Sequence, residues 1–244
     1  MSGARVLLLG GTAEARALAE VLVDRGVEVT SSLAGRVARP RLPVGPVRIG
    51  GFGGIDGLRV ALVDFDLVID ATHPFAQGMS ANAVAACEAT GTPLLRFERA
   101  GWEPRATWHY VEDHDDAARL AATLGQHPLL TVGRQELARF VPDLAGSDVL
   151  ARVVDTPDLT LPGSWTLLSS RGPYELEGER SLMRSHGTDV LVTKDSGGTF
   201  TWPKMEAAEE LGVSIVVVRR PDGPEGVPSV DSLDRAVAWL EERR

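Results

Sequence analysis

The chain has 244 residues, of which 43% are hydrophobic and 24% charged, and its formal net charge is −9. This length suits one large α/β domain or two small ones, and the composition is that of a soluble globular protein. The negative charge argues against a nucleic-acid partner, and no apolar run reaches the roughly 18 residues that span a membrane. Because the N-terminal apolar run is also too short for a signal peptide, we expect a cytoplasmic protein.

The first hundred residues alternate between apolar runs and segments with helical periodicity. The predicted strands and helices, in chain order, are a strand at 6–10, a helix at 13–26, strands at 27–33, 47–51 and 66–70, a helix at 77–90 and a strand at 93–97. Strands that alternate with helices imply a parallel sheet with right-handed crossovers. This segment therefore has the pattern of a doubly wound, Rossmann-type fold.

The pattern loosens after Gly101 and restarts near residue 127. Further elements are predicted as strands at 127–133, 148–154, 164–170 and 189–199, a helix at 174–186, and a final helix–strand–helix run that reaches the C-terminus. We therefore expect an α/β protein of two Rossmann-like lobes with parallel sheets, residues 1–125 and 126–244. Open parallel sheets bind ligands at the carboxyl ends of their strands, so we expect an active-site cleft between the lobes.

Two features carry a structural rather than a chemical prediction. Cys87, the single cysteine, lies in an alanine-rich helical stretch with no flanking cation, so we expect a buried, inert thiol. The acidic run DHDD (113–116) resembles a ligand cluster only in composition, and we expect it to cap a helix. We predict no metal site.

The segment VLLLGGTAEA predicts a strand, a glycine turn and a helix. Gly10 and Gly11 would let the backbone approach a diphosphate, and the helix that begins near Thr12, Ala13 and Glu14 would favour an anion. A tight strand–helix turn without ligand is the alternative. Because the G-x-G-x-x-G spacing is absent, the turn alone does not decide between them.

The end of the second predicted strand indicates which nucleotide this turn would hold. NAD-binding units place an acidic residue there for the ribose hydroxyls, whereas NADP-binding units place groups that accept a phosphate. Between Val29 and Arg41 there is no carboxylate, and Ser31 and Ser32 are followed by Arg36. We therefore predict NADPH as cofactor, with an ordinary basic loop as the alternative.

The ATHPFA segment follows the strand predicted to lie beside the first. Its residues Thr72, His73 and Pro74 should therefore lie near the nicotinamide half of the cofactor. His73 is a candidate acid or base, and a histidine before proline at a strand end can equally be a structural hydrogen-bonding residue.

Taken together, LLLGGTAEAR, SSLAGR, VIDATHPFA, VGRQELARF, SSRGPY and VLVTKDSGGTFTWPKMEAAEELGVSIVVVRRP resemble the precorrin-6A reductase family of cobalamin biosynthesis. The resemblance covers nearly the whole chain. It implies NADPH-dependent reduction of one double bond of the precorrin-6A macrocycle, which gives precorrin-6B. It also implies two Rossmann-like lobes with the active site between them, and a small-molecule tetrapyrrole as the only expected ligand besides the cofactor. We expect neither nucleic acid nor membrane as a partner, and a monomer or weak dimer.

The resemblance assigns substrate binding to the second lobe, because the macrocycle is an apolar ring fringed with carboxylates. The positions that match are Arg134, Gln135, Arg171, Lys194, Ser196, Gly197, Gly198 and Lys204. Asp195 stands where the family pattern has Asn. We expect it to turn away, capping a helix or pairing with Lys194; otherwise it is a proton donor. His73, Asp195 or solvent could supply the proton that the reduction needs.

Two other functions remain as alternatives. A different NADP-dependent reductase of short-chain type would use a Tyr-x-x-x-Lys pair, and neither Tyr110 nor Tyr174 precedes a lysine by four residues. A non-catalytic NADP-binding regulatory module would not need the cationic glycine loop around Lys194.

Overall fold

The chain forms two compact units. A computed structural model describes residues 3–35 and 40–243, and it assigns Met1–Ala100 and Pro221–Arg244 to unit 1 and Gly101–Arg220 to unit 2. The predicted boundary near residue 125 is therefore displaced, because the chain enters unit 2 earlier and returns to unit 1 near its end. The α/β class with two parallel sheets is confirmed.

Unit 1 is a six-stranded parallel sheet with helices on both faces. Its strands run in the order β12-β5-β4-β1-β2-β3. The elements are β1 (Arg5–Leu9), α1 (Ala13–Asp24), β2 (Glu28–Leu33), β3 (Val47–Ile49), α2 (Gly54–Ala61), η1 (Leu62–Asp64), β4 (Leu67–Asp70), α3 (Gln77–Thr90), β5 (Leu94–Phe97), β12 (Ser229–Val230) and α8 (Leu233–Glu241). Because β1 and β4 are neighbours but not consecutive, the strand order reverses between them, which is where such sheets bind ligands.

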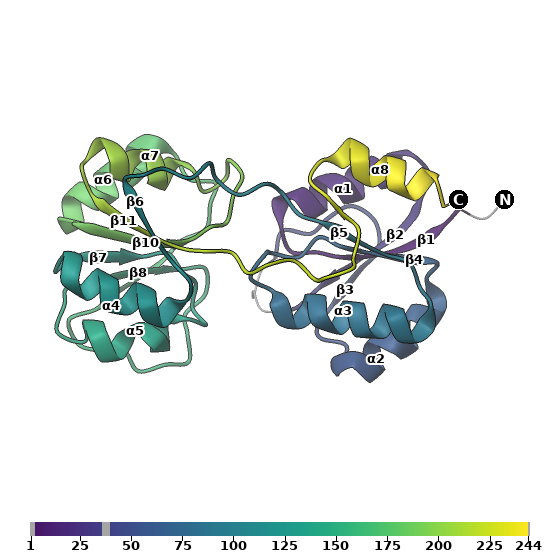
Figure 1. The fold of residues 1–244 in the computed structure, drawn as a ribbon, viewed down its shortest axis with the longest axis horizontal. Coiled ribbons are helices and arrows are strands. Elements are labelled where there is room, and N and C mark those ends of the chain that lie inside the picture. The colour runs from purple at the N-terminus through teal and green to yellow at the C-terminus, as the bar shows by residue number, and fades with distance from the viewer. Residues whose placement is uncertain (1–2, 36–39, 244) are drawn as a thin grey trace. The chain divides into compact units, whose positions relative to one another are not determined.

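The central strand β1 shows why this sheet forms. Leu7, Leu8 and Leu9 are almost completely buried, as expected for a strand covered on both faces. Leu8 packs with α1 and α8 on one face, and Leu7 and Leu9 pack with α2 and α3 on the other. Figure 1 shows the two pairs of helices on opposite faces of this sheet.

Unit 2 repeats the same architecture. Its strands run in the order β6-β11-β10-β7-β8-β9. The elements are β6 (Trp108–Val111), α4 (His114–Leu124), β7 (Pro128–Leu130), α5 (Leu137–Leu144), β8 (Leu150–Val153), β9 (Thr166–Ser169), α6 (Leu176–His186), β10 (Val190–Lys194), α7 (Pro203–Glu210) and β11 (Ser214–Val218). The order reverses between β7 and β10, so this pair corresponds to β1 and β4 of unit 1.

The outer strands β6 and β12 explain the displaced boundary. β6 precedes the other strands of unit 2 and pairs in parallel with β11, and β12 follows all of unit 2 yet pairs with β5 of unit 1. The sequence predicted neither pairing, because a two-residue strand such as Ser229–Val230 carries no periodicity that could assign it to a sheet. The last strand and helix thus complete unit 1, not the second lobe as predicted.

Two smaller predictions are confirmed. Asp113 caps α4, since its side chain accepts a hydrogen bond from Asp116 N at 2.8 Å. Cys87 is buried inside α3.

Within the described residues, no helix is long and apolar enough to cross a bilayer, and no group of three or more His, Cys, Asp or Glu is arranged to hold a metal ion.

The Cys87 thiol should be nearly unreactive in the folded protein. Burial, and to a smaller extent the negative charge of Asp70, raise the pKa of this thiol to about 12. An ordinary thiol has a pKa of about 8.5, so we expect alkylation by iodoacetamide to be at least about a hundredfold slower than for a free thiol at mildly alkaline pH. Mass spectrometry of the labelled protein measures this rate, with the same chain in urea as control. Equal rates in the folded and unfolded protein would contradict the prediction.

Candidate active site

The glycine turn of unit 1 joins β1 to α1. Gly11 has a φ of +118°, which L side chains rarely adopt, and Gly10 N donates to Ser32 O at 2.9 Å. Thr12 is the N-cap: its hydroxyl accepts from Ala15 N at 3.0 Å and donates to Ala71 O at 3.0 Å. Because that proton is already used, an anion at this turn would be bound by backbone amides of the first helical turn.

Glu14 lies in the first turn of α1 but pairs with a cation. Its carboxylate lies 2.6 Å from Arg99 Nη1. This ion pair joins α1 to the segment after β5, so Glu14 has a structural contact. Its predicted contact with the cofactor stays a prediction. Ala13, the first residue of the helix, contributes its backbone amide to the N-terminus of α1.

Two buried serines end β2. Ser31 is 1% exposed, and no described residue forms a hydrogen bond with its hydroxyl. Ser32 Oγ accepts from Arg48 Nη1 at 3.4 Å. An unpaired buried hydroxyl is costly and is usually satisfied by a ligand or water, which fits a polar group bound at this strand end. Arg36, predicted to bind the phosphate, lies outside the described residues.

Sequence reasoning missed Arg48. It lies in β3 in register with Ser32, donates to Gly50 O at 2.9 Å and Gly51 O at 3.1 Å, and stacks over the Phe52 ring at 3.8 Å. The sequence predicted that an arginine of the loop after Leu33 would lie beside the serines. The guanidinium that contacts Ser32 instead comes from the next strand. An arginine within a short predicted edge strand was the available signal.

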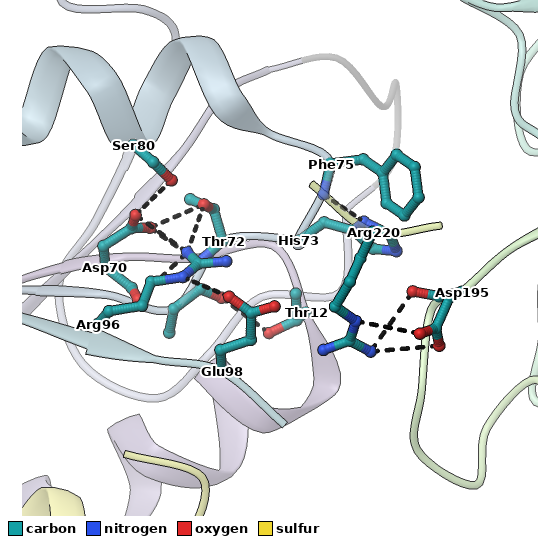
Figure 2. Close-up of polar contacts among 11 residues, drawn as sticks. Thr12, Asp70, Thr72, His73, Phe75, Ser80, Arg96, Glu98, Asp195 and Arg220 are labelled. Atoms are coloured by element: carbon teal, nitrogen blue, oxygen red, sulfur yellow. Dashed lines mark hydrogen bonds and ion pairs between the residues drawn. The ribbon is translucent and has the colours of Figure 1, made fainter. Parts of the chain in front are cut away.

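The segment after β4 is held by a buried polar network (Figure 2). Asp70 Oδ1 accepts from Thr72 N at 3.1 Å and Thr72 Oγ1 at 2.7 Å, while Asp70 Oδ2 accepts from Ser80 Oγ at 2.6 Å. Arg96 of β5 lies 2.9 Å from Asp70 Oδ2 and 2.9 Å from Glu98 Oε2. Asp70 and Arg96 are 2% and 3% exposed. Thr72, predicted to bind cofactor, thus uses its hydroxyl in this network.

His73 follows directly, with its imidazole half-buried beside Phe75. Its Nδ1 accepts from Phe75 N at 3.3 Å, and Pro74 after it is buried. Since Nδ1 accepts, we assign the proton of the neutral ring to Nε2. The network under Thr72 therefore supports the His73 ring at the strand-order reversal of unit 1.

The glycine loop of unit 2 follows β10 and comprises Asp195, Ser196, Gly197 and Gly198. Both glycines have left-handed backbone, with φ of +61° and +66°. Ser196 N donates to Lys194 O at 2.6 Å, and Gly198 O accepts from Trp102 Nε1 at 3.0 Å. Consecutive residues of this kind turn backbone amides toward one side of a loop, which is a common way to bind carboxylates.

Asp195 does not form either predicted contact. Its carboxylate lies 3.3 Å from Arg220 Nε and accepts from Trp102 N at 3.2 Å, so its partner is not Lys194 and it caps no helix. The role of Asp195 as a proton donor stays a prediction. No pattern in the sequence predicts a contact with Arg220, which lies 25 residues away.

The two predicted lysines lie in different surroundings. Lys194 ends β10 half-buried, and its Nζ lies 3.8 Å from where a Cβ on Gly133 would be. Burial lowers the pKa of Lys194, and the nearby Glu136 carboxylate partly offsets this. Lys204 is 3% exposed, donates to Thr201 O at 3.0 Å and lies over the Trp102 ring at 4.8 Å. Lys204 therefore supports the glycine loop from the interior.

The remaining predicted residues divide between two places. Gly133, Arg134 and Gln135 follow β7, the neighbour of β10, so they lie at the same sheet edge as Lys194. Arg134 donates to Thr156 O at 3.4 Å, and Gln135 is exposed. Arg171 is exposed after β9, three strands from β10 and so about 14 Å away at the usual strand spacing. The role of Arg171 in substrate binding stays a prediction.

These observations define a class of protein. Unit 1 has the strand order of dinucleotide-binding α/β proteins, with a glycine turn and helix N-terminus at its reversal, and unit 2 places a cationic glycine loop at the equivalent point. A nicotinamide-dependent reductase of two Rossmann-like units fits both features.

Comparison with known proteins gives the family. Residues 5–241 match the family model "Precorrin-6x reductase CbiJ/CobK". A precorrin-6A reductase of Rhodococcus erythropolis is 49% identical over 241 residues, covering 97% of each chain. One of Mycobacterium tuberculosis is 48% identical with the same coverage. The solved structure of CobK precorrin-6A reductase matches with a TM-score of 0.90 at 39% identity, over 98% of this chain and 97% of that one. The chain belongs to the precorrin-6x reductase family, and as a reductase of that family it uses a nicotinamide cofactor.

Proposed function

We propose that this chain reduces one double bond of precorrin-6A with NADPH, giving precorrin-6B in cobalamin biosynthesis. The observation that carries the choice of NADPH is the end of β2, where two buried serines, one of them without a described partner, lie beside Arg48, and where the sequence from Val29 to Arg41 has no carboxylate. A carboxylate there would bind ribose hydroxyls and repel a 2′-phosphate, whereas hydroxyl and guanidinium groups bind phosphate. Arg36 remains a proposed ligand on sequence grounds.

Unit 1 would bind the cofactor. The amides at the start of α1 would hold the diphosphate, since the Thr12 hydroxyl is already engaged as the cap. When bound, NADPH supplies the hydride, and the protein contributes orientation and the exclusion of water. The Asp70–Arg96 network supports the segment that carries His73.

Unit 2 would bind the macrocycle. Its carboxylates would interact with the Lys194 ammonium and with the amides of Gly197 and Gly198, while Arg134 and Gln135 lie at the same sheet edge. Reduction also needs a proton. Of the sources proposed from the sequence, solvent is favoured, because Asp195 is engaged by Arg220 and a neutral His73 ring that accepts at Nδ1 has no proton that it readily releases.

The two lysines make the substrate site testable. Replacing Lys194 with methionine should raise the KM for precorrin-6A about tenfold and leave the dissociation constant of NADPH unchanged. The matched variant, Lys204→Met, should instead reduce stability, by about 1–3 kcal/mol, because it leaves Thr201 O unpaired beneath Trp102. Steady-state kinetics and urea unfolding measure the two effects. Equal KM changes in both variants would show that Lys204 also reaches the substrate.

The reaction itself is tested by turnover. Purified protein, anaerobic precorrin-6A and NADPH should give loss of NADPH absorbance mole for mole with precorrin-6B. Replacing precorrin-6A with its cobalt-containing analogue distinguishes the two substrate forms used by such enzymes, and we expect faster turnover of the metal-free form. Tight NADPH binding without turnover of either macrocycle would favour a regulatory module instead.

A further inference from the structure

We infer that Asp195 and Arg220 form a clamp that sets the conformation of the glycine loop of unit 2, and that Asp195 is thereby a positioning residue for the substrate site. The clamp comprises Gly101, Trp102, Asp195 and Arg220. Its role in catalysis depends on the proposed function, in which the glycine loop binds macrocycle carboxylates. Its existence as a structural device does not.

The first part of the clamp joins the loop to the segment that enters unit 2. Gly101 is the first residue of that unit, and Trp102 follows it. Trp102 N donates to Asp195 Oδ1 at 3.2 Å, and Trp102 Nε1 donates to Gly198 O at 3.0 Å. One residue therefore contacts both ends of the loop, so the distance between Asp195 and Gly198 is fixed by the backbone and indole of Trp102.

The second part joins the loop to the segment that leaves unit 2. Arg220 is its last residue. Its Nε lies 3.3 Å from Asp195 Oδ2, and its Nη2 lies 3.3 Å from Oδ1 and 3.4 Å from the main-chain oxygen of Asp195. Figure 2 shows this guanidinium facing the carboxylate edge-on. The side chains of Arg220 and Asp195 are 19% and 18% exposed, so solvent screens the pair only partly.

Gly101 is fitted to the clamp. A Cβ at this position would lie 2.7 Å from Asp195 Oδ2 and 3.4 Å from Arg220 Nη2. The carboxylate thus occupies the space that a side chain would need. Gly101 and Arg220 are the first and last residues of unit 2. The Asp195 carboxylate therefore joins the glycine loop to the chain segment that enters the unit and to the segment that leaves it.

The clamp also restricts the conformational freedom that the two glycines give the loop. Gly197 and Gly198 leave the backbone of the loop with many accessible conformations, and such freedom must be lost before amides can bind a carboxylate. The two hydrogen bonds to Trp102 and the ion pair with Arg220 reduce this conformational freedom before a ligand binds. Preorganisation of this kind improves binding without any new contact to the ligand.

Amide hydrogen exchange tests the clamp directly. In Asp195→Ala, peptides covering residues 101–102 and 195–199 should exchange at least about tenfold faster than in the wild type, while peptides of β7 and β10 remain protected. Gly101→Ala should have the same effect through the added methyl group. The matched control is Asp115→Asn, which removes an exposed ion pair with Arg139 in the same unit. Unchanged exchange of the loop in Asp195→Ala would overturn the clamp.

Kinetics test the positioning role. The KM for precorrin-6A should rise about tenfold in Asp195→Ala and Arg220→Met, with the NADPH dissociation constant unchanged within about twofold. Arg220→Lys keeps the charge and should recover most of the affinity. An unchanged KM in a variant whose loop exchanges faster, or an equal rise in Asp115→Asn, would overturn the role in substrate binding. If the wild-type protein failed to turn over precorrin-6A, the exchange data would still decide the clamp, so the two claims fail separately.

Discussion

Replacing Arg96 with methionine is expected to lower the free energy of unfolding of unit 1 by about 3–5 kcal/mol, because it leaves the buried Asp70 carboxylate without its counter-charge. Thr72 and Ser80 would still donate hydrogen bonds to Asp70, but two hydroxyls do not compensate a charge in a site where both partners are almost fully buried. Urea unfolding read by hydrogen exchange, with peptides of unit 1 followed separately, measures the loss.

Two variants show whether the effect comes from the stranded charge. Arg96→Met combined with Asp70→Asn removes both charges and should recover a substantial part of the lost stability. Arg5→Met removes an ion pair between β1 and Asp66, the residue before β4. Since both side chains of that pair are nearly half exposed, the loss of stability should be much smaller. Equal losses in Arg96→Met and Arg5→Met would contradict the description of Asp70 as a buried, charge-dependent support for the His73 segment.

Replacing Gly11 with alanine is expected to raise the dissociation constant of NADPH at least about tenfold, which corresponds to about 1.4 kcal/mol of binding free energy. The backbone at this position has a φ of +118°, and no atom of the described residues lies within 4 Å of an added Cβ. Alanine would strain the turn and place a methyl group where we propose that the diphosphate approaches the helix.

Gly26→Ala is the matched control for this variant. Gly26 follows the other end of the same helix and also has positive φ, at +74°. Within the part of the chain that the structure describes, it too has no atom within 4 Å of an added Cβ. Both variants should lose stability through backbone strain, but Gly26→Ala should leave the NADPH dissociation constant unchanged. Fluorescence titration with NADPH measures both constants. If both variants bound NADPH as tightly as the wild type, the turn after β1 would be a structural turn and not the cofactor site.

Much of the fold follows from patterns that local physics determines. β1 and β4 are apolar runs buried on both faces, and α1 begins at a threonine whose side chain caps it, so both could be predicted from neighbouring residues alone. The assignment of β6 and β12 could not, because it depends on pairing with strands more than a hundred residues away in the chain. The alternation of strands and helices predicts a parallel sheet, but it does not predict which segment of the chain forms the outer strand of that sheet.

The site shows the same division. Sequence position was sufficient to predict that Ser31 and Ser32 end a strand beside the glycine turn. It could not predict that Arg48 would reach Ser32 from the next strand, or that Arg220 would pair with Asp195, since those contacts depend on tertiary packing. Charged residues inside apolar runs indicate buried ion pairs, and two such residues are present. Asp70 ends LVID, Arg96 lies within LLRF, and the two side chains form an ion pair in the core.

The central claim is that this chain passes a hydride from NADPH to the precorrin-6A ring. The most direct measurement uses NADPH that carries deuterium at one or the other transferable position of the nicotinamide ring, with mass spectrometry of the precorrin-6B formed. We expect one of the two labelled cofactors to give product heavier by a single deuterium and the other to give unlabelled product. We also expect NADH to support the reaction at least about a hundredfold less efficiently in kcat/KM. Product without deuterium from either labelled cofactor, or equal efficiency with NADH, would contradict it.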